Sequence, residues 1–186
     1  MSSLVASLAN GLSGATLLAR GRSDGLGRVQ RDLDGAARSF WAIGISVPAL
    51  VCMRLIDWKV SGTPPDPAHA IGLDLLIFLV GWLGFAVLTR SLVARIGRVH
   101  RWPGYIAVWN WCNVVQYVLM LLAAIPLLFH APAPISEAAE LVALGWALWL
   151  EWFATRLTLD VPALVAGAFV LLDLSLGLLL AAVAGP

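Results

Sequence analysis

The sequence predicts an all-α membrane protein: a polytopic bundle of five transmembrane helices preceded by an amphipathic N-terminal region. Of its 186 residues, 60% are hydrophobic and 12% are charged, whereas soluble domains are roughly half apolar and about a quarter charged. Several apolar stretches are long enough for a helix to cross about 30 Å of hydrocarbon. Alternating strand-sized segments are not seen in the sequence. Helices are therefore the expected spanning elements, since each satisfies its own backbone hydrogen bonds.

Residues 1–38 are predicted to form the amphipathic region on the cytoplasmic face. Residues 4–18 gather their apolar side chains within about 100° of a helical wheel, which indicates a helix lying on the membrane. No Lys or Arg leads this stretch, so we expect no cleaved signal peptide. After the break "GRSDG", residues 26–40 repeat the pattern with arginines on the polar side. We interpret them as a cytoplasmic helix leading into the first span; an interfacial anchor near anionic headgroups is the alternative.

Five apolar stretches predict the spans of one bundle, residues 39–186. They cover residues 39–58, 70–89, 104–129, 137–157 and 161–184. Prolines punctuate them, because proline is excluded from most helix interiors but tolerated in a first turn. "KVSGTPPDPAH" ends the first span, "RWPG" opens the third, "HAPAP" follows it and "LDVP" opens the fifth. The fourth span is the most highly charged.

The basic residues predict how the chain is threaded through a bacterial inner membrane. Ten of the 12 lie before the first span, between the second and third, or between the fourth and fifth: Arg20, Arg22, Arg28, Arg31, Arg38, Arg90, Arg95, Arg98, Arg101 and Arg156. Arg54 and Lys59 lie on the other side. Because Lys and Arg stay in the cytoplasm, we expect a cytoplasmic N-terminus and a periplasmic C-terminus.

An ionisable side chain within the bilayer needs a partner. Arg54 and Asp74 have similar depths in the first and second spans, so we predict a salt bridge that neutralises both. A gated ion path is the alternative interpretation.

The third span carries a polar face. Asn110, Asn113, Gln116 and Tyr117 fall within an arc of about 120° on a helical wheel, and Trp111 points away from it. Lipid offers amides no hydrogen bond, so this arc should face the bundle, where each interhelical bond contributes about 0.6 kcal/mol. A substrate pocket is the alternative.

The last two spans each carry an acid. In the fourth, Glu151 lies opposite three tryptophans and at the depth of Asn110 and Asn113, which we expect to donate hydrogen bonds to it. In the fifth, Asp173 lies in a stripe of small residues and matches the depth of Gln116. It is either a functional acid or a neutral acid bonded to that amide. The candidate interface residues are Trp146, Trp149 and Trp152 of the fourth span and Ala166 and Gly177 of the fifth.

The remaining residues give no catalytic or metal-binding signature. Net charge is +1 and gives no indication of a nucleic-acid partner. We expect no enzyme activity, no cofactor, no metal and no disulfide, because no known motif occurs and the histidines and cysteines are isolated. These isolated residues are His69, His100, His130, Cys52 and Cys112.

Two likenesses follow from these features. "WNWCNVVQ" in the third span and "EWFATRLTLDVPALVAGAFVLLDLSLGLLL" at the end resemble a group of small bacterial inner-membrane proteins, which implies no established activity. An amphipathic N-terminus before five spans is also similar to the plan of Yip-type membrane proteins, which are linked to membrane trafficking and shaping.

The sequence favours a non-enzymatic protein that works by association, either as an accessory or assembly subunit of a larger membrane complex or as a homo-oligomer. The small residues of the fifth span, the tryptophans of the fourth and the amphipathic N-terminus all provide contact surfaces, whereas no catalytic motif occurs. The alternatives are a small transporter or proton-coupled channel that uses Asp173 and Glu151, and a Yip-like membrane-shaping protein. The lipid bilayer is the one partner common to all of them; a small-molecule substrate remains unspecified.

Overall fold

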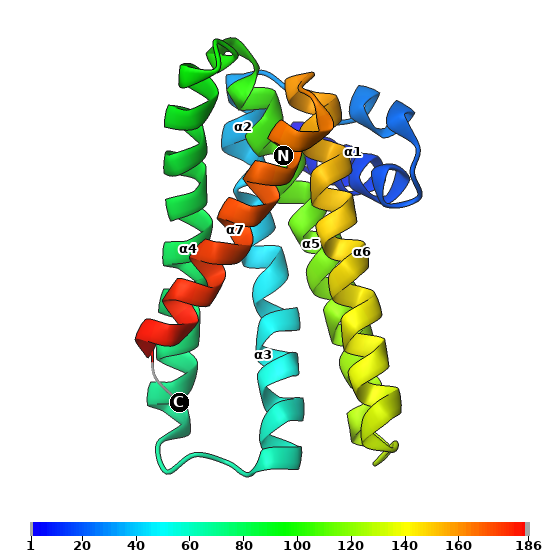
Figure 1. The fold of residues 1–186 in the computed structure, drawn as a ribbon, viewed down its shortest axis with the longest axis vertical. Coiled ribbons are helices and arrows are strands. Elements are labelled where there is room, and N and C mark those ends of the chain that lie inside the picture. The colour runs from blue at the N-terminus through cyan, green and yellow to red at the C-terminus, as the bar shows by residue number, and fades with distance from the viewer. Residues whose placement is uncertain (1, 185–186) are drawn as a thin grey trace.

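A computed structural model describes residues 2–184, and within that range all regular structure is helical. Its helices are α1 (Ser2–Ala19), η1 (Ser23–Gly27), α2 (Leu33–Ser39), α3 (Trp41–Ser61), α4 (Pro67–Arg95), η2 (Val99–Arg101), α5 (Trp102–Leu128), α6 (Ala133–Leu159) and α7 (Ala163–Ala184). Helices α3 to α6 run along the long axis of the molecule (Figure 1). Helix α7 crosses them obliquely, and α1 lies across one end of the bundle.

Four segments are long and apolar enough to cross a membrane: Leu33–Ser61, Pro67–Arg95, Val99–Leu128 and Ala163–Val183. The chain is therefore a membrane protein by length and composition. Helix α6 is not among the four, and it carries Glu137, Glu140, Glu151 and Arg156. It nevertheless has 27 residues, as α5 does, and packs along α5 for most of its length.

The long helices begin where local residues favour it. Pro67 and Pro103 occupy first-turn positions of α4 and α5, where a missing N–H costs nothing. Asp66 caps α4 by accepting a hydrogen bond from His69 N at 3.0 Å. Between α6 and α7, Asp160 adopts a left-handed conformation with φ 53°, which reverses the chain before Pro162. This reversal places α7 against both α6 and α4.

The two ends of the bundle differ in charge. The end that holds α2, η2 and the α6–α7 turn carries the arginines of the interhelical segments (Figure 1). Arg98 and Arg101 both pair with Asp160 there, at 3.4 and 3.3 Å. Toward the opposite end, Arg54 of α3 forms the predicted salt bridge with Asp74 of α4, and its Nε donates to Oδ2 at 2.5 Å. The match in depth that suggested this pair is present.

The N-terminal region is part of the packed bundle. Helix α1 packs against α5 at one end of the molecule, and Ala15 and Leu18 are fully buried. A Cβ atom on Gly11 would lie 2.4 Å from the indole of Trp111, so only glycine permits this approach. The second amphipathic helix is also shorter than predicted, since α2 begins at Leu33 behind an Asp32 cap.

The predicted close approach along the small residues of α7 is found only in part. Ala166 is fully buried, but a Cβ atom on Gly177 would meet nothing within 4 Å. The tight position lies on the facing helix: a Cβ atom on Gly81 of α4 would lie 3.2 Å from Leu180, whereas one on Gly84 would make an ordinary contact with Leu176 at 3.7 Å. Leucines of α7 therefore fit against glycines of α4, and Gly177 is left facing open space.

Candidate functional site

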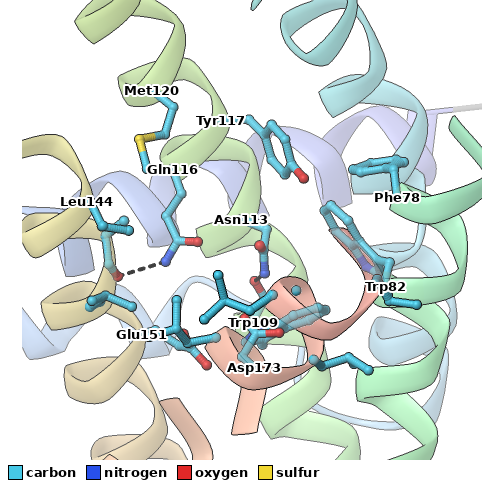
Figure 2. Close-up of a pocket in the computed structure, with 18 of the residues that line it drawn as sticks. Phe78, Trp82, Trp109, Asn113, Gln116, Tyr117, Met120, Leu144, Glu151 and Asp173 are labelled. Carbon is cyan, nitrogen blue, oxygen red and sulfur yellow. Dashed lines mark hydrogen bonds between the residues drawn. The ribbon is translucent and has the colours of Figure 1, made fainter. Parts of the chain in front are cut away.

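A partly open cavity of about 450 Å³ lies where α4, α5, α6 and α7 meet. Figure 2 shows its lining residues: Glu151, Asp173 and Trp109 gather at one end, while Tyr117 and Met120 lie toward the other. Gly177 contributes to the wall, which explains why its missing side chain leaves room. The cavity has the size of a small-molecule site, for which roughly 300–1,000 Å³ is usual.

Two carboxyl groups from different helices meet in this cavity. Glu151 projects from α6 and is 4% exposed, and Asp173 projects from α7 and is partly buried. Figure 2 shows the two side chains close to each other at the same end of the cavity. Oε1 of Glu151 and the indole N–H of Trp109 are both buried, and neither has a hydrogen-bond partner among residues 2–184. Both unpaired groups belong to residues that line the cavity.

The amides expected to bond Glu151 do not do so. Asn110 donates to Ser39 Oγ at 2.7 Å and accepts from the Trp82 indole N–H at 2.7 Å. Asn113 donates to the carbonyl of Trp109 in its own helix at 3.0 Å. The predicted contacts from Asn110 and Asn113 to Glu151 are therefore wrong, because rotation about α5 turns Asn110 toward α2 and α4 instead of α6.

The expected contact between Asp173 and Gln116 is also wrong. Gln116 Nε2 donates to the carbonyl of Ala147 at 2.9 Å and so joins α5 to α6 (Figure 2). Asp173 faces Glu151 instead. The polar arc of α5 does face the bundle, since Asn110 and Asn113 are buried and Gln116 and Tyr117 are partly buried. Gln116, Glu151 and Asp173 all line the same cavity, but the hydrogen-bond partners predicted for them were wrong.

Four aromatic rings form a continuous part of the cavity wall. Phe78 and Trp82 come from α4, and Trp109 and Tyr117 come from α5. Phe78 makes edge contacts with Trp82 and Tyr117, with ring centres 5.2 and 5.4 Å apart. Trp82 stacks on Tyr117 at 6.2 Å and meets Trp109 edge-on at 5.4 Å. Phe78 and Trp82 could not be recognised as site residues from the sequence, since two aromatics four residues apart in an apolar span are equally typical of a lipid-facing surface.

The tryptophans of α6 have three different environments. Trp149 is 38% exposed and stacks on Phe153 with ring centres 5.4 Å apart. Trp146 is partly buried beside it. Trp152 donates its indole N–H to the carbonyl of Ala163 at 3.0 Å, and the guanidinium of Arg156 lies 5.5 Å from its ring centre. Trp152 thus joins α6 to α7, and only Trp149 presents a substantial outward face.

The cavity lining includes no Lys, Arg or His among the described residues. Within residues 2–184, no group of three or more His, Cys, Asp or Glu side chains is arranged to hold a metal ion. The site is thus a pair of acids beside aromatic rings, with no basic side chain on its wall. Such a site can bind protons or a positively charged group, because either one neutralises a buried carboxylate.

No protein-family model matches this sequence, and comparisons with curated proteins and with solved structures find no similar chain. The likenesses drawn from short sequence stretches and from the span plan gain no support from these comparisons. The cavity and its residues are therefore the observations on which a function can be argued.

Proposed function

We propose that this protein is a multi-pass membrane protein of the transporter class, which binds a small solute in the cavity between α4, α5, α6 and α7. Glu151 and Asp173 are the groups that engage the solute, and they release a proton when it binds. The observation that carries this proposal is the buried carboxyl pair, with an unpaired Oε1 on Glu151, facing a cavity of about 450 Å³. Acids at depth in a membrane bundle commonly mark solute or proton pathways.

Two features support a binding role over a purely structural one. A structural acid pair would be expected to have its oxygens satisfied by neighbouring donors, because an unpaired buried polar group costs roughly 1–3 kcal/mol. Here the amides of the cavity lining, Asn113 and Gln116, donate to backbone carbonyls instead. The cavity also leaves space beside the acids, where a structural contact would be closely packed.

The proposal includes a membrane orientation. All five long helices, α3 to α7, cross the bilayer of a bacterial inner membrane, with the arginine-rich end in the cytoplasm. The less apolar α6 is tolerated because its buried acid, Glu151, faces the cavity and not lipid. The N-terminus is then cytoplasmic and the C-terminus periplasmic.

Water access to the cavity tests the proposal. In a Cys52→Ser/Cys112→Ala background, Gly177→Cys places a thiol in the cavity wall, where a Cβ meets nothing within 4 Å. We expect a charged, membrane-impermeant methanethiosulfonate reagent to modify it in liposomes. Gly145→Cys is the matched negative control, because it is exposed on α6 outside the cavity lining. Ser61→Cys, exposed at the end of α3, is the positive control.

Modification of Gly177→Cys at a rate between the two controls supports a solvated binding cavity. If Gly177→Cys reacts no faster than Gly145→Cys while Ser61→Cys reacts fully, water does not enter the cavity and the transporter proposal is wrong.

Association is a second candidate function, and the outward face of Trp149 favours it. Trp149 and Phe153 form a stacked aromatic pair on α6, and aromatic residues dominate protein interfaces. In this proposal the protein is an accessory subunit or a homo-oligomer. Light scattering of the protein in mild detergent tests it: a larger species that Trp149→Leu converts to a monomer supports association, and a wild-type protein that is strictly monomeric without a stoichiometric partner contradicts it.

A further inference from the structure

We infer that the cavity binds a monovalent organic cation, an amine or quaternary ammonium compound with an apolar body, in exchange for a proton. This inference rests on the proposed function and specifies its solute. It is carried by the juxtaposition of the Glu151–Asp173 pair with an aromatic wall in a cavity that has no basic side chain in its described lining. Figure 2 shows the acids and the rings around the same space.

The charge of the two carboxyl groups limits what can bind beside them. An ionised carboxylate inside a membrane bundle requires a compensating positive charge. No Lys, Arg or His belongs to the described lining of the cavity. Arg54 pairs with Asp74, Arg98 and Arg101 pair with Asp160, and Arg156 lies over the ring of Trp152. The counter-charge for Glu151 and Asp173 must therefore be a proton or a bound cation.

The aromatic wall favours one type of cation. The faces of Trp and Tyr rings attract cations, and organic ammonium groups are the ligands that aromatic sites bind through this interaction. Trp82, Trp109 and Tyr117 all line the cavity. A bare metal ion is not favoured, because its ligands would be clustered oxygens or nitrogens, and no such cluster of three occurs in the described range.

The apolar part of the cavity lining favours an apolar body for the rest of the solute. Beyond the acids and rings, the cavity is lined by apolar side chains such as Ile77, Leu144 and Leu174. These contacts favour an apolar body of small-molecule size over a hydrated inorganic ion. Oε1 of Glu151 is buried and unpaired, so it is available to accept a hydrogen bond from an ammonium N–H or to contact a quaternary group.

Binding exchanges a proton of the carboxyl pair for the cation. Without solute, the acid pair holds protons that keep it close to neutral. When one cation enters, one O–H bond of the pair breaks, the proton leaves to water, and the carboxylate pairs with the cation, so charge in the cavity is unchanged. The other titratable groups near the pair are Tyr105, Cys112 and Tyr117 of α5, while the α4 side of the described lining supplies only uncharged residues.

Calorimetry on the full-length protein in lipid nanodiscs tests the inference, with benzyltrimethylammonium as the probe. We expect binding whose affinity rises by up to about tenfold per pH unit where one proton is exchanged per cation. Titrations in two buffers with different protonation enthalpies should show one proton released per cation bound. This measurement uses the wild-type protein and does not depend on any variant folding.

Two comparisons separate charge from shape. Choline should bind and its uncharged isostere 3,3-dimethylbutanol should not. Asp173→Asn and Glu151→Gln should each lower the affinity for benzyltrimethylammonium at least tenfold and abolish proton release. Glu140→Gln, which removes an exposed acid from the same helix, is the matched control and should leave both unchanged.

The outcomes distinguish this inference from the proposed function. If Gly177→Cys is modified by the water-soluble reagent but benzyltrimethylammonium does not bind, or binds without proton release, the solute assignment is wrong while the binding cavity stands. Equal binding of choline and 3,3-dimethylbutanol overturns the inference in the same way. If Gly177→Cys is inaccessible, both proposals are wrong.

Discussion

Asn110 joins three helices through one side chain. It projects from α5, is fully buried, donates to Ser39 at the end of α2 and accepts from Trp82 of α4. Trp82 in turn lies in the aromatic wall of the cavity. A residue at this position therefore controls both the stability of the bundle and the placement of an aromatic ring at the candidate site.

Replacing Asn110 with alanine should lower the free energy of unfolding by about 1–2 kcal/mol, because two interhelical bonds are lost and two buried partners are left unsatisfied. Asn113→Ala is the matched control: its amide donates only within its own helix, so it should cost less. Reversible unfolding by sodium dodecyl sulfate in mixed micelles measures both changes. Equal costs for the two variants would contradict this account.

At the scale of the helix, close packing against α5 holds α1 in place. Its glycine at position 11 lies against the indole of Trp111, and Leu18 is fully buried in the same core. The polar face of α5 turns toward α4 and α6, and α1 covers the opposite face. Without α1, Trp111 would face lipid or water.

Gly11→Ala should destabilise the protein by about 1–3 kcal/mol, because the added methyl group overlaps the indole and forces α1 outward. Gly145→Ala, in α6, adds the same group where nothing lies within 4 Å. It should be neutral or should stabilise the helix by up to about 1 kcal/mol. Thermal unfolding in detergent tests the pair, and an unchanged midpoint for Gly11→Ala would show that α1 is not held at Trp111.

The start of α2 predicts a pH dependence. Gly35 N donates to Asp32 Oδ1 at 2.7 Å, and this hydrogen bond, with a second from Gln30, holds the pKa of Asp32 below its usual range. A lowered folded-state pKa means that the contribution is present above the unfolded value of about 4 and is lost as pH falls through the folded value. Asn caps helices as well as Asp does.

Asp32→Asn should therefore match the wild type in cap geometry but lack this acid-dependent loss. The difference between the thermal midpoints of wild type and variant, measured from pH 7 to pH 3, isolates Asp32 because the other carboxyl groups titrate in both. The wild type should lose stability relative to the variant as the solution is acidified. A difference that stays constant over this range would contradict the prediction.

Helix positions could be predicted from the sequence because proline placement and apolar length are local signals. Helices α4, α5 and α7 begin at or next to prolines 67, 103 and 162. Partners across helices could not be predicted in the same way. Gln116 and Asp173 match in depth, yet a rotation about α5 sends Gln116 to Ala147. Rotation depends on the packing of whole helices, including α1, whose site at Trp111 no local pattern reveals.

At the scale of the whole molecule, threading connects the charge distribution to the candidate site. Helices α6 and α7 deliver Glu151 and Asp173 to the same cavity because they are antiparallel neighbours joined by the short turn at Asp160. The same turn is held by Arg98 and Arg101. If α6 crosses the bilayer, the arginine-rich end and the α5–α6 turn lie on opposite sides of the membrane.

Reporter fusions should show five crossings. Alkaline phosphatase fused after residue 62 or 131 should be active, since the enzyme requires the oxidising periplasm, and fusions after residue 97 or 160 should be inactive. Green fluorescent protein at the same four positions gives the complementary readout. If the fusions after residues 131 and 160 behave alike, α6 does not cross and the proposed orientation of α7 is wrong.

The contact between Gly11 and Trp111 also sets an order of events during biosynthesis. Helix α1 is translated before its docking surface at Trp111, which follows one hundred residues later, about 5–20 s at roughly 5–20 residues per second. Through that interval its apolar side can be shielded only by lipid or a chaperone. The amphipathic pattern of α1 therefore suits binding to the membrane surface during synthesis, and the same apolar side chains pack against α5 in the folded protein.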